Sequence, residues 1–452
     1  MKPNSADTMG KLKKEIAGWG GMAKGETCLF RPEKIEHILR GSPLFSARGL
    51  GRSYGDASLN TGGEVILMER LNRLLSFNAE NHVLKAEAGA TIRDIVETFS
   101  TKGYFVPVTP GTKEATLGGC LAADAHGKNH HADGSFSDHV LEFELMLPDG
   151  TKRRVRRQDE ELFYATAGGM GLTGVITEVT LKLLPVETPF IKVLNTPFES
   201  LTCLIKKLNE SSDAARYSVA WLDLLSFKND KVNSILIEGD HAKRGELPDK
   251  LKSKEAKPIS IPFSFPSLAL NRTTQKLFNK IYFYQQKKKG APFFCHYNPF
   301  FYPLDRIGNW NRMYGSRGFY QYQFVVPEAN AEEALRDILA HLTAARCPVY
   351  LAVLKKFGKK NPGYLSFPME GFTLAMDIPG NQPDLFHLLC QLDLIVMKNH
   401  GRVYLAKDFH VTPDVFRAMY PDYTRFLAVK RKVDPANLIQ TDLARRLRIG
   451  EQ

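Results

Sequence analysis

The stretch from Gly49 to Asp56 combines backbone freedom with side chains that can bind an anion. It reads Gly-Leu-Gly-Arg-Ser-Tyr-Gly-Asp, and glycine permits backbone angles and close approaches that other side chains block. Successive N–H groups in such a turn can converge on an anion, which makes the turn suitable for a pyrophosphate. The alternative interpretation is a glycine-rich surface turn with a solvated arginine, because short glycine motifs also arise by chance.

A second candidate stretch runs from Thr116 to His131. Its first half is built mainly from small residues, and its second half places three histidines and a lysine within residues 126–131. Histidine is a common metal ligand, but adjacent histidines point in alternate directions, and no cysteine or carboxylate stands at a supporting spacing. A flat surface of small residues followed by polar donors better fits a planar cofactor with a reaction on one face. We therefore predict no metal.

A third glycine-rich stretch, residues 168–174, contains a formal Gly-x-Gly-x-x-Gly pattern. In a Rossmann fold this pattern follows a strand and opens a helix. Here residues 175–184 alternate between two faces, with Val175, Val179 and Leu183 on the same one, which predicts a strand. The context excludes NAD binding by a Rossmann fold.

The elements that must position these stretches follow from periodicity and turn signals. We predict a short strand and a helix within 27–47, strands at 65–68, 83–88 and 175–184, and a hairpin of 138–147 with 151–157. The helix at 91–102 has the clearest signals, because Thr91 can cap it, Asp94 stands at the capping-box spacing and Gly103 ends it. The order strand, strand, helix predicts an α+β unit.

A second α+β domain is predicted after a boundary at Pro185. Residues 241–299 are rich in lysine and proline, which predicts a mobile basic loop that is either a solvated insertion or a lid or lipid-headgroup contact. A strand at 320–327 puts Gln321 and Gln323 on one face, which would ordinarily face solvent. Helices at 331–344 and 383–399 and strands at 349–355 and 371–378 follow, before a helical basic tail.

Composition and charge restrict the class of protein. Of 452 residues, 43% are hydrophobic and 24% charged, as in a globular protein of two or three domains. The net charge of +12 favours phosphates, nucleic acid or anionic lipid as partners, without choosing among them. Six scattered cysteines indicate a reducing compartment, and neither a signal peptide nor a long apolar run occurs. We expect a cytoplasmic protein with a basic surface that can touch a membrane.

Seven motifs in order along the chain carry a resemblance to a known family. They span residues 48–56, 126–131, 171–174, 310–319, 321–324, 406–408 and 431–435. With them the chain resembles the FAD-binding oxidoreductases of the p-cresol methylhydroxylase/vanillyl-alcohol oxidase superfamily, and among these the decaprenylphosphoryl-β-D-ribose oxidases, flavin subunits of a 2'-epimerase. The resemblance implies an α+β fold: a two-subdomain FAD-binding domain formed by residues 1–185 and completed by 401–452, with a substrate domain of residues 186–400 that contains an antiparallel sheet.

The same resemblance implies which residues hold the cofactor. The pyrophosphate would lie at the glycine loop, and the remaining contacts would come from two further stretches and a few single positions. The implied FAD-binding residues are Gly49, Leu50, Gly51, Arg52, Ser53, Tyr54, Gly55, Asp56, Gly111, Thr116, Leu117, Gly118, Gly119, His126, Gly127, Lys128, Asn129, Ile176 and Tyr404. Many relatives have a histidine in the glycine loop that bonds covalently to the flavin. Arg52 stands at that place here, so FAD is expected to bind non-covalently.

Oxidation of an alcohol by FAD needs a group that takes the hydroxyl proton and a cation that stabilises the reduced flavin. Lys407, in the motif at 406–408, is the candidate for both roles, with His126 as the alternative proton acceptor. The resemblance further implies a sugar-phosphate pocket in which the lysines offer charge to the phosphate. Its residues would be Lys128, Trp221, Gln321, Gln323, Lys355 and Thr373.

The substrate follows from the resemblance, with two departures. We predict oxidation of the 2'-hydroxyl of a polyprenyl-phosphate pentose, a step of cell-wall polysaccharide synthesis, paired with an NAD(P)H-dependent keto-reductase. Peripheral contact with the inner membrane face is expected, and no nucleic-acid partner. Thr373 and Ala375 stand where the family has Asn and Cys, which leaves the precise sugar open and should prevent trapping by thiol-directed inhibitors. The alternatives are a sugar or aldonolactone oxidase with a soluble substrate, and a non-catalytic flavin- or phosphate-binding module.

Overall fold

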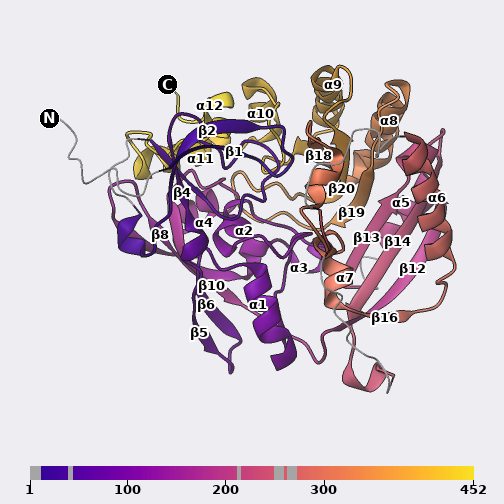
Figure 1. Ribbon diagram of the computed structural model, residues 1–452, viewed down its shortest axis with the longest axis horizontal. Helices are drawn as coiled ribbons and strands as arrows, with labels where there is room; N and C mark the ends of the chain where they lie inside the picture. Colours follow the sequence, from indigo (N-terminus) through magenta and orange to yellow (C-terminus); the bar gives the residue numbers. More distant parts are fainter. Residues whose placement is uncertain (1–11, 39–43, 211–214, 249–258, 262–271, 452) are drawn as a thin grey trace.

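The computed structural model describes residues 12–38, 44–210, 215–248, 259–261 and 272–451. Helices and sheets are mixed along the chain, which confirms the α+β class. The N-terminal part (indigo and purple) and the C-terminal end (yellow) lie together on one side of the molecule, and the large sheet of the middle of the chain (magenta to orange) lies on the other (Figure 1).

Two sheets form the N-terminal part. The first has the order β1 (Leu12–Ala17), β2 (Lys24–Phe30), β4 (Glu64–Leu67), β3 (Phe45–Arg48). The second has the order β5 (Leu74–Asn78), β6 (Val83–Glu87), β10 (Val175–Lys182), β8 (Val140–Met146), β9 (Lys152–Arg156). The short strands β7 (Tyr104–Phe105) and β11 (Leu184–Pro185) pair separately. The predicted hairpin and the strand after residue 174 are confirmed.

Four helices accompany these sheets: α1 (Ile92–Phe99), α2 (Leu117–Ala122), α3 (His130–Asp133) and α4 (Glu160–Thr166). The predicted capping box of α1 is present, since Thr91 and Asp94 exchange hydrogen bonds between side chain and backbone. A 3-10 turn over residues 100–102 follows, and Gly103, with φ at +86°, ends it. In contrast, the helical residues in the described part of 27–47 form only the 3-10 turn Ile35–His37, so the helix predicted there was wrong.

The C-terminal helices α10 (Pro413–Met419), α11 (Tyr423–Val433) and α12 (Asp442–Arg446) are joined to the N-terminal part. The backbone N–H of Phe45 donates to the carbonyl of Leu438, and Asp442 accepts from both the N–H and the hydroxyl of Thr61. In α11 and just after it, Nζ of Lys430 lies 2.8 Å from Oδ2 of Asp434, and both side chains are buried. The two ends of the chain therefore form one packed region.

The middle of the chain forms an eight-stranded sheet in which every paired neighbour is antiparallel, as predicted. Its order is β16 (Phe293–His296), β12 (Phe190–Ser200), β14 (Lys231–His241), β13 (Tyr217–Leu222), β19 (Leu351–Phe357), β20 (Gly371–Pro379), β18 (Phe319–Val326), β21 (Arg402–Val403). The short strands β15 (Ile259–Ser260) and β17 (Ile307–Gly308) pair in parallel beside it.

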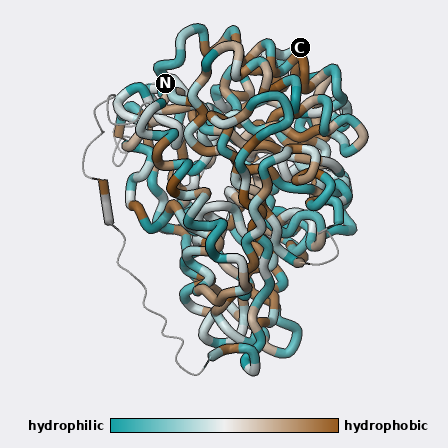
Figure 2. Tube along the Cα trace, turned by 90° about the vertical axis from the view of Figure 1, so that its right-hand side faces the viewer, coloured by the Kyte–Doolittle hydropathy of each residue, from teal (hydrophilic) through white to brown (hydrophobic). Residues whose placement is uncertain are grey.

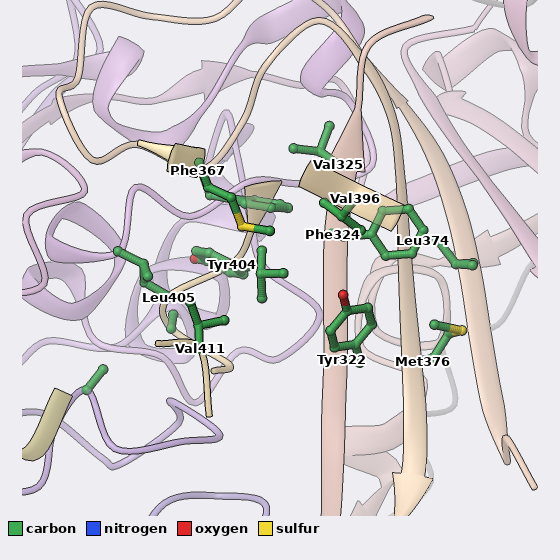
Figure 3. Close-up of a cluster of buried hydrophobic side chains, with 14 of the residues drawn as sticks. Tyr322, Phe324, Val325, Phe367, Leu374, Met376, Val396, Tyr404, Leu405 and Val411 are labelled. Carbon is green, nitrogen blue, oxygen red and sulfur yellow. The ribbon is translucent and has the colours of Figure 1, made fainter. Parts of the chain in front are cut away.

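Helices α5 (Leu201–Glu210), α8 (Ala331–Ala344) and α9 (Leu385–Lys398) share one hydrophobic core with one face of this sheet. Figure 3 shows part of that core, where Tyr322, Phe324, Leu374 and Met376 lie together. Hydrophobic segments (brown) likewise run through the interior in Figure 2. The apolar periodicity of residues 331–344 predicted α8 with its observed ends, because six of its apolar side chains are buried at helical spacing.

Residues 241–299 are not simply a loop. The structure forms helix α6 (Arg272–Lys287), strand β16 and the start of α7 (Tyr297–Phe301) within this region, which corrects the prediction there. The parts at 249–258 and 262–271 lie outside the described residues. On the face of the sheet opposite α9, Phe283 of α6 packs with Trp221 and Ile235.

Candidate active site

Two close approaches fix the glycine loop. A Cβ atom added to Gly49 would stand 2.3 Å from the hydroxyl oxygen of Thr116, and one added to Gly55 would stand 2.0 Å from the carbonyl oxygen of Asp408. Both positions therefore require glycine. The N–H of Tyr54 also donates to the carbonyl of Ala406 at 3.0 Å. The loop is thus pressed between the turn at Thr116 and the turn that carries Lys407.

The middle of the glycine loop offers a half-buried cation. The guanidinium of Arg52 lies 3.9 Å from the centre of the Trp19 ring. The backbone N–H of Trp19 donates to the carbonyl of Ser53. Burial lowers the pKa of Arg52, and its Nε is buried without a hydrogen-bond partner among the described residues. A buried donor of this kind calls for an acceptor from outside the chain.

The second glycine-rich stretch is itself closely packed, and open space lies at two glycines outside it. Thr116 caps α2 and accepts from the N–H of Gly119, so the small residues of 116–119 form the first turn of this helix. A Cβ added to Gly111 or Gly171 would meet no described atom within 4 Å, which marks open space at both positions. The cradle at the glycine loop, the unpartnered Arg52 and this space together fit a dinucleotide with a planar ring.

The predicted substrate residues share one face of the eight-stranded sheet. Gln321 pairs with Asp377 across β18 and β20, and Lys355 pairs with Thr373 across β19 and β20. Side chains of directly paired residues project to the same face, and the register extends this face to Gln323 and to Trp221 on β13. The glutamines do share a face, as predicted. Both are buried, so this polar face does not meet solvent as a polar strand face ordinarily would.

Three lysines from three separate segments converge on this face. Burial lowers the pKa of Lys355 to about 8. Burial and the positive charge of Lys355 lower the pKa of Lys128 to about 7 and that of Lys407 also to about 7. Of the described carboxylates, only Asp377 opposes this effect, and it does so at Lys407. A group of partly buried lysines with so few carboxylates is suited to an anionic ligand.

Lys407 and His126 differ in their readiness to accept a proton. Burial, Lys355 and Lys407 hold the pKa of His126 well below its usual range. The amide nitrogen of Gln323 lies 3.0 Å from Nε2 of His126 and 2.9 Å from the hydroxyl of Thr373. Because the amide donates to Nε2, the accepting lone pair of His126 is already occupied. Lys407, which is partly exposed and 5.3 Å from the centre of the Tyr54 ring, is the better base.

Several other predicted residues have clear local roles. The carboxylate of Asp56 binds the guanidinium of Arg446. The side-chain amide of Asn129 donates to the carboxylate of Asp133. The ammonium of Lys128 donates to the carbonyl of Phe300. The Tyr404 hydroxyl donates to a backbone carbonyl and its ring stacks on Phe367, as Figure 3 shows. Leu117 and Ile176 are buried and belong to the core, and a Cβ added to Gly118 or Gly127 would stand within 3 Å of a neighbouring atom.

Sequence reasoning missed Asp377, whose pKa is raised by burial to about 6 and which accepts from the amide of Gln321 and the hydroxyl of Tyr314. A signal was available, because Asp377 continues the alternation of Thr373 and Ala375 on the same face of one strand. Trp19 carried no such signal, since its contact with Arg52 depends on the folded chain. Among the described residues, no cluster of metal-ligating side chains is present.

Two family models match this chain. Residues 42–156, which include the glycine loop and the stretch at 116–131, match the model described as FAD binding domain. Residues 314–447, which include β18, β20 and Lys407, match the model described as D-arabinono-1,4-lactone oxidase.

Two curated relatives are similar over most of their length. Decaprenylphosphoryl-beta-D-ribose oxidase of Mycolicibacterium smegmatis is 35% identical over 96% of this chain and 98% of its own. L-gulonolactone oxidase of Bos taurus is 24% identical over 90% of this chain and 92% of its own.

Proposed function

Because the chain belongs to the family of FAD-binding oxidoreductases that includes decaprenylphosphoryl-β-D-ribose oxidase, we propose that it oxidises the 2'-hydroxyl of a polyprenyl-phosphate pentose. The protein is an FAD-dependent oxidoreductase that acts on a CH–OH group. The observation that supports a phosphorylated substrate is the convergence of Lys128, Lys355 and Lys407 on one buried face. The phosphate of the substrate would supply the charge that this face lacks.

Each side chain of the site has a role in this proposal. When bound, FAD would supply the hydride acceptor for the carbinol carbon. The neutral form of Lys407, about half of the side chain at pH 7, takes the hydroxyl proton at Nζ and thereby becomes a cation where negative charge develops. Lys355 and Lys128 hold the phosphate, and Gln323, fixed by His126 and Thr373, orients the sugar. The backbone of residues Gly49 to Gly55 and the side chain of Arg52 would hold the pyrophosphate of FAD non-covalently.

The product would be a ketone at C2'. A separate NAD(P)H-dependent keto-reductase that adds hydride to the opposite face would complete an epimerisation. Within the chain, we propose that residues 1–185 and 401–452 form the FAD-binding domain and that residues 186–400 form the substrate domain. The contacts between Phe45 and Leu438 and between Thr61 and Asp442 support the joining of the two ends.

A second candidate is oxidation of a soluble aldonolactone. The match of residues 314–447 to D-arabinono-1,4-lactone oxidase and the similarity to L-gulonolactone oxidase favour it. Anaerobic mixing of the FAD-loaded protein with a polyprenyl-phosphate pentose or with free aldonolactones separates the two. Loss of the yellow flavin absorbance is expected only with the phosphopentose, and bleaching only by a lactone would favour the second candidate.

We further propose that α6 brings the protein to an anionic membrane surface. Its inner face is polar, since Gln275 and Asn279 are buried and bind Tyr350 and Asp223. Four of its apolar residues face outward, since Leu277, Phe278, Ile281 and Tyr284 are each about half exposed or more, whereas Phe283 is buried. The helix has four basic and no acidic residues, and Tyr282 packs on Trp221 of the substrate face. Such a basic, outward-apolar helix fits a membrane interface.

Co-sedimentation with lipid vesicles tests this contact. Phe278→Glu should reduce binding to anionic vesicles, whereas Phe386→Glu, at an exposed phenylalanine on α9, should not. Equal binding by both variants and the unaltered protein would contradict the proposal. Across the described ranges, no helix is long and apolar enough to cross a membrane.

A further inference from the structure

The turn that carries Lys407 is bound to a row of side chains of alternating charge, which we call the ionic row. Its members are Asp56, Arg446, Asp408, His410 and Asp393. Arg446 donates to both carboxylate oxygens of Asp56, at 2.8 and 2.9 Å, and lies 2.9 Å from Oδ2 of Asp408. Nδ1 of His410 lies 3.0 Å from Oδ1 of Asp408, and its Nε2 lies 2.8 Å from Oδ2 of Asp393. The row therefore runs from the glycine loop, past Lys407, to helix α9.

His410 is the member of the row that reaches the substrate strand. Its Nδ1 lies 2.7 Å from the hydroxyl oxygen of Tyr320, and this hydroxyl donates its one proton to Asp408. The hydroxyl of Tyr322 donates to the other oxygen of Asp393 at 2.8 Å. Tyr320 and Tyr322 alternate along β18 with the two glutamines, so they project to the opposite face of the sheet. The ionic row therefore binds β18 on the face opposite the two glutamines. Figure 3 shows Tyr322 on that opposite face, among the core residues.

The backbone on the other side of Lys407 is equally constrained. Oδ1 of Asp408 accepts from the N–H groups of His410 and Val411, and the carbonyl of Asp408 touches Gly55. Lys407 therefore sits in a turn whose next residue is bound to the cofactor loop, to α12 and to His410. A substitution of His410 would therefore shift Asp408, and with it the adjacent Lys407.

We propose that His410 is a positioning residue: by bridging Asp408 and Asp393 as a cation, it fixes Lys407 relative to the substrate residues of β18. The side chain of His410 is only 3% exposed, and those of both carboxylates are 4% or less, so the bridge lies in a dry environment. A cation between two buried carboxylates is retained because its loss would leave two uncompensated charges.

The protonation of His410 follows from every charged group around it. Burial alone would lower its pKa, but the hydrogen bonds and charges of Asp393 and Asp408 raise it to about 9. Arg446 lies behind Asp408, and the tyrosine hydroxyls of β18 complete the surroundings. His410 is therefore a cation at neutral pH and loses its proton only in alkaline solution.

The inference rests on the proposed role of Lys407 as the base. The groups that would bind the phosphate, Lys128 and Lys355, lie on other elements, and the cofactor loop keeps its own contacts with Thr116 and Trp19. Loss of the bridge should therefore misplace the base without weakening substrate or FAD binding. Displacement of a catalytic group by about 1 Å can lower a rate by about 100-fold.

The first test compares His410→Gln, Asp393→Asn and their combination with His387→Gln, at an exposed histidine on α9 that serves as the control. For either bridge variant kcat should fall at least about tenfold while KM changes by less than about threefold, with FAD content unchanged. The double variant should be no slower than the slower single variant, because both remove one bridge. A kcat within about twofold of the unaltered protein, a loss driven by KM, or loss of FAD from folded protein would overturn the proposal.

The second test does not depend on turnover. In protein with ¹⁵N-labelled histidine, the imidazole signal missing from His410→Gln should stay in its protonated form up to about pH 9, and Asp393→Asn should lower its titration point. Titration near the ordinary histidine value would overturn the bridge even where a variant folds poorly. If the protein reduces with a lactone and not with a phosphopentose, the kinetic test is run with the lactone, so failure of the proposed substrate and failure of the bridge are distinguishable.

Discussion

Replacement of Lys407 by methionine tests the proposed base, because methionine has similar length but cannot take a proton. The unaltered lysine has a pKa lowered to about 7 by burial and by Lys355, so about half of it is neutral at pH 7. Loss of a positioned general base lowers a rate by about 10²- to 10⁴-fold. We therefore expect anaerobic flavin reduction to slow by about 1,000-fold in Lys407→Met.

The direction in which kcat/KM changes with pH tests the same assignment of Lys407. The base acts as the neutral amine, and the neutral fraction of Lys407 rises from about a tenth at pH 6 to about nine-tenths at pH 8, so kcat/KM should rise with pH on the acid side of its optimum. Phosphate binding requires the protonated form of Lys355, whose pKa is about 8, so kcat/KM should fall again above that value. With a substrate that lacks phosphate, the alkaline limb should weaken while the acid limb stays.

The assay is stopped-flow absorbance of the flavin under anaerobic conditions, with FAD content measured for each variant. Lys356→Met is the matched control, because Lys356 is next to Lys355 on β19 and pairs with Glu328 instead. It should react like the unaltered protein. A Lys407→Met protein that holds FAD and reacts within about tenfold of the unaltered rate would refute the assignment. In that case, His126 would be the remaining candidate.

Three other predictions follow from the same contacts. Lys355→Met should raise KM for the phosphopentose by about 10- to 100-fold, since a charged hydrogen bond contributes about 1.5–3 kcal/mol, with Lys356→Met again as the control in steady-state kinetics. Gly55→Ala should purify with little FAD, because its Cβ would lie 2.0 Å from a carbonyl oxygen of the turn that carries the base; full yellow colour would contradict this. Asp434→Asn should lower the free energy of unfolding by about 3–5 kcal/mol, because it leaves Lys430 buried without its partner; an unchanged denaturation midpoint would argue against that pair.

Most of the regular elements could be predicted because their patterns are local. The capping box of α1 needs only Thr91 and Asp94, and the ends of α8 follow from its buried apolar positions. Helix α6 was missed because its polar residues face inward: Asn279 binds Asp223, while apolar residues such as Phe278 face outward. Hydrophobic periodicity therefore gave no indication of its buried face.

The candidate site divides in a similar way. Lys407 and the glycine loop could be predicted from motifs, since each is a short run of residues. Asp377 could have been found from strand alternation, but its closeness to Lys407 depends on the pairing of β18 with β20. The link from Asp56 to Arg446 joins residues that are hundreds of positions apart, and the link on to Asp408 joins separate turns. No local pattern contains them, so they became visible only in the folded chain.

The central claim is that the buried lysine face selects a phosphorylated lipid-linked pentose as the hydride donor for bound FAD. The most direct measurement is the anaerobic rate of flavin bleaching in the FAD-loaded protein by a polyprenyl-phosphate pentose, compared with the same pentose without its phosphate and with an aldonolactone. The account predicts fast, saturable bleaching with the phosphopentose and little or none with the other two. Equal or faster bleaching by a donor without phosphate would contradict it.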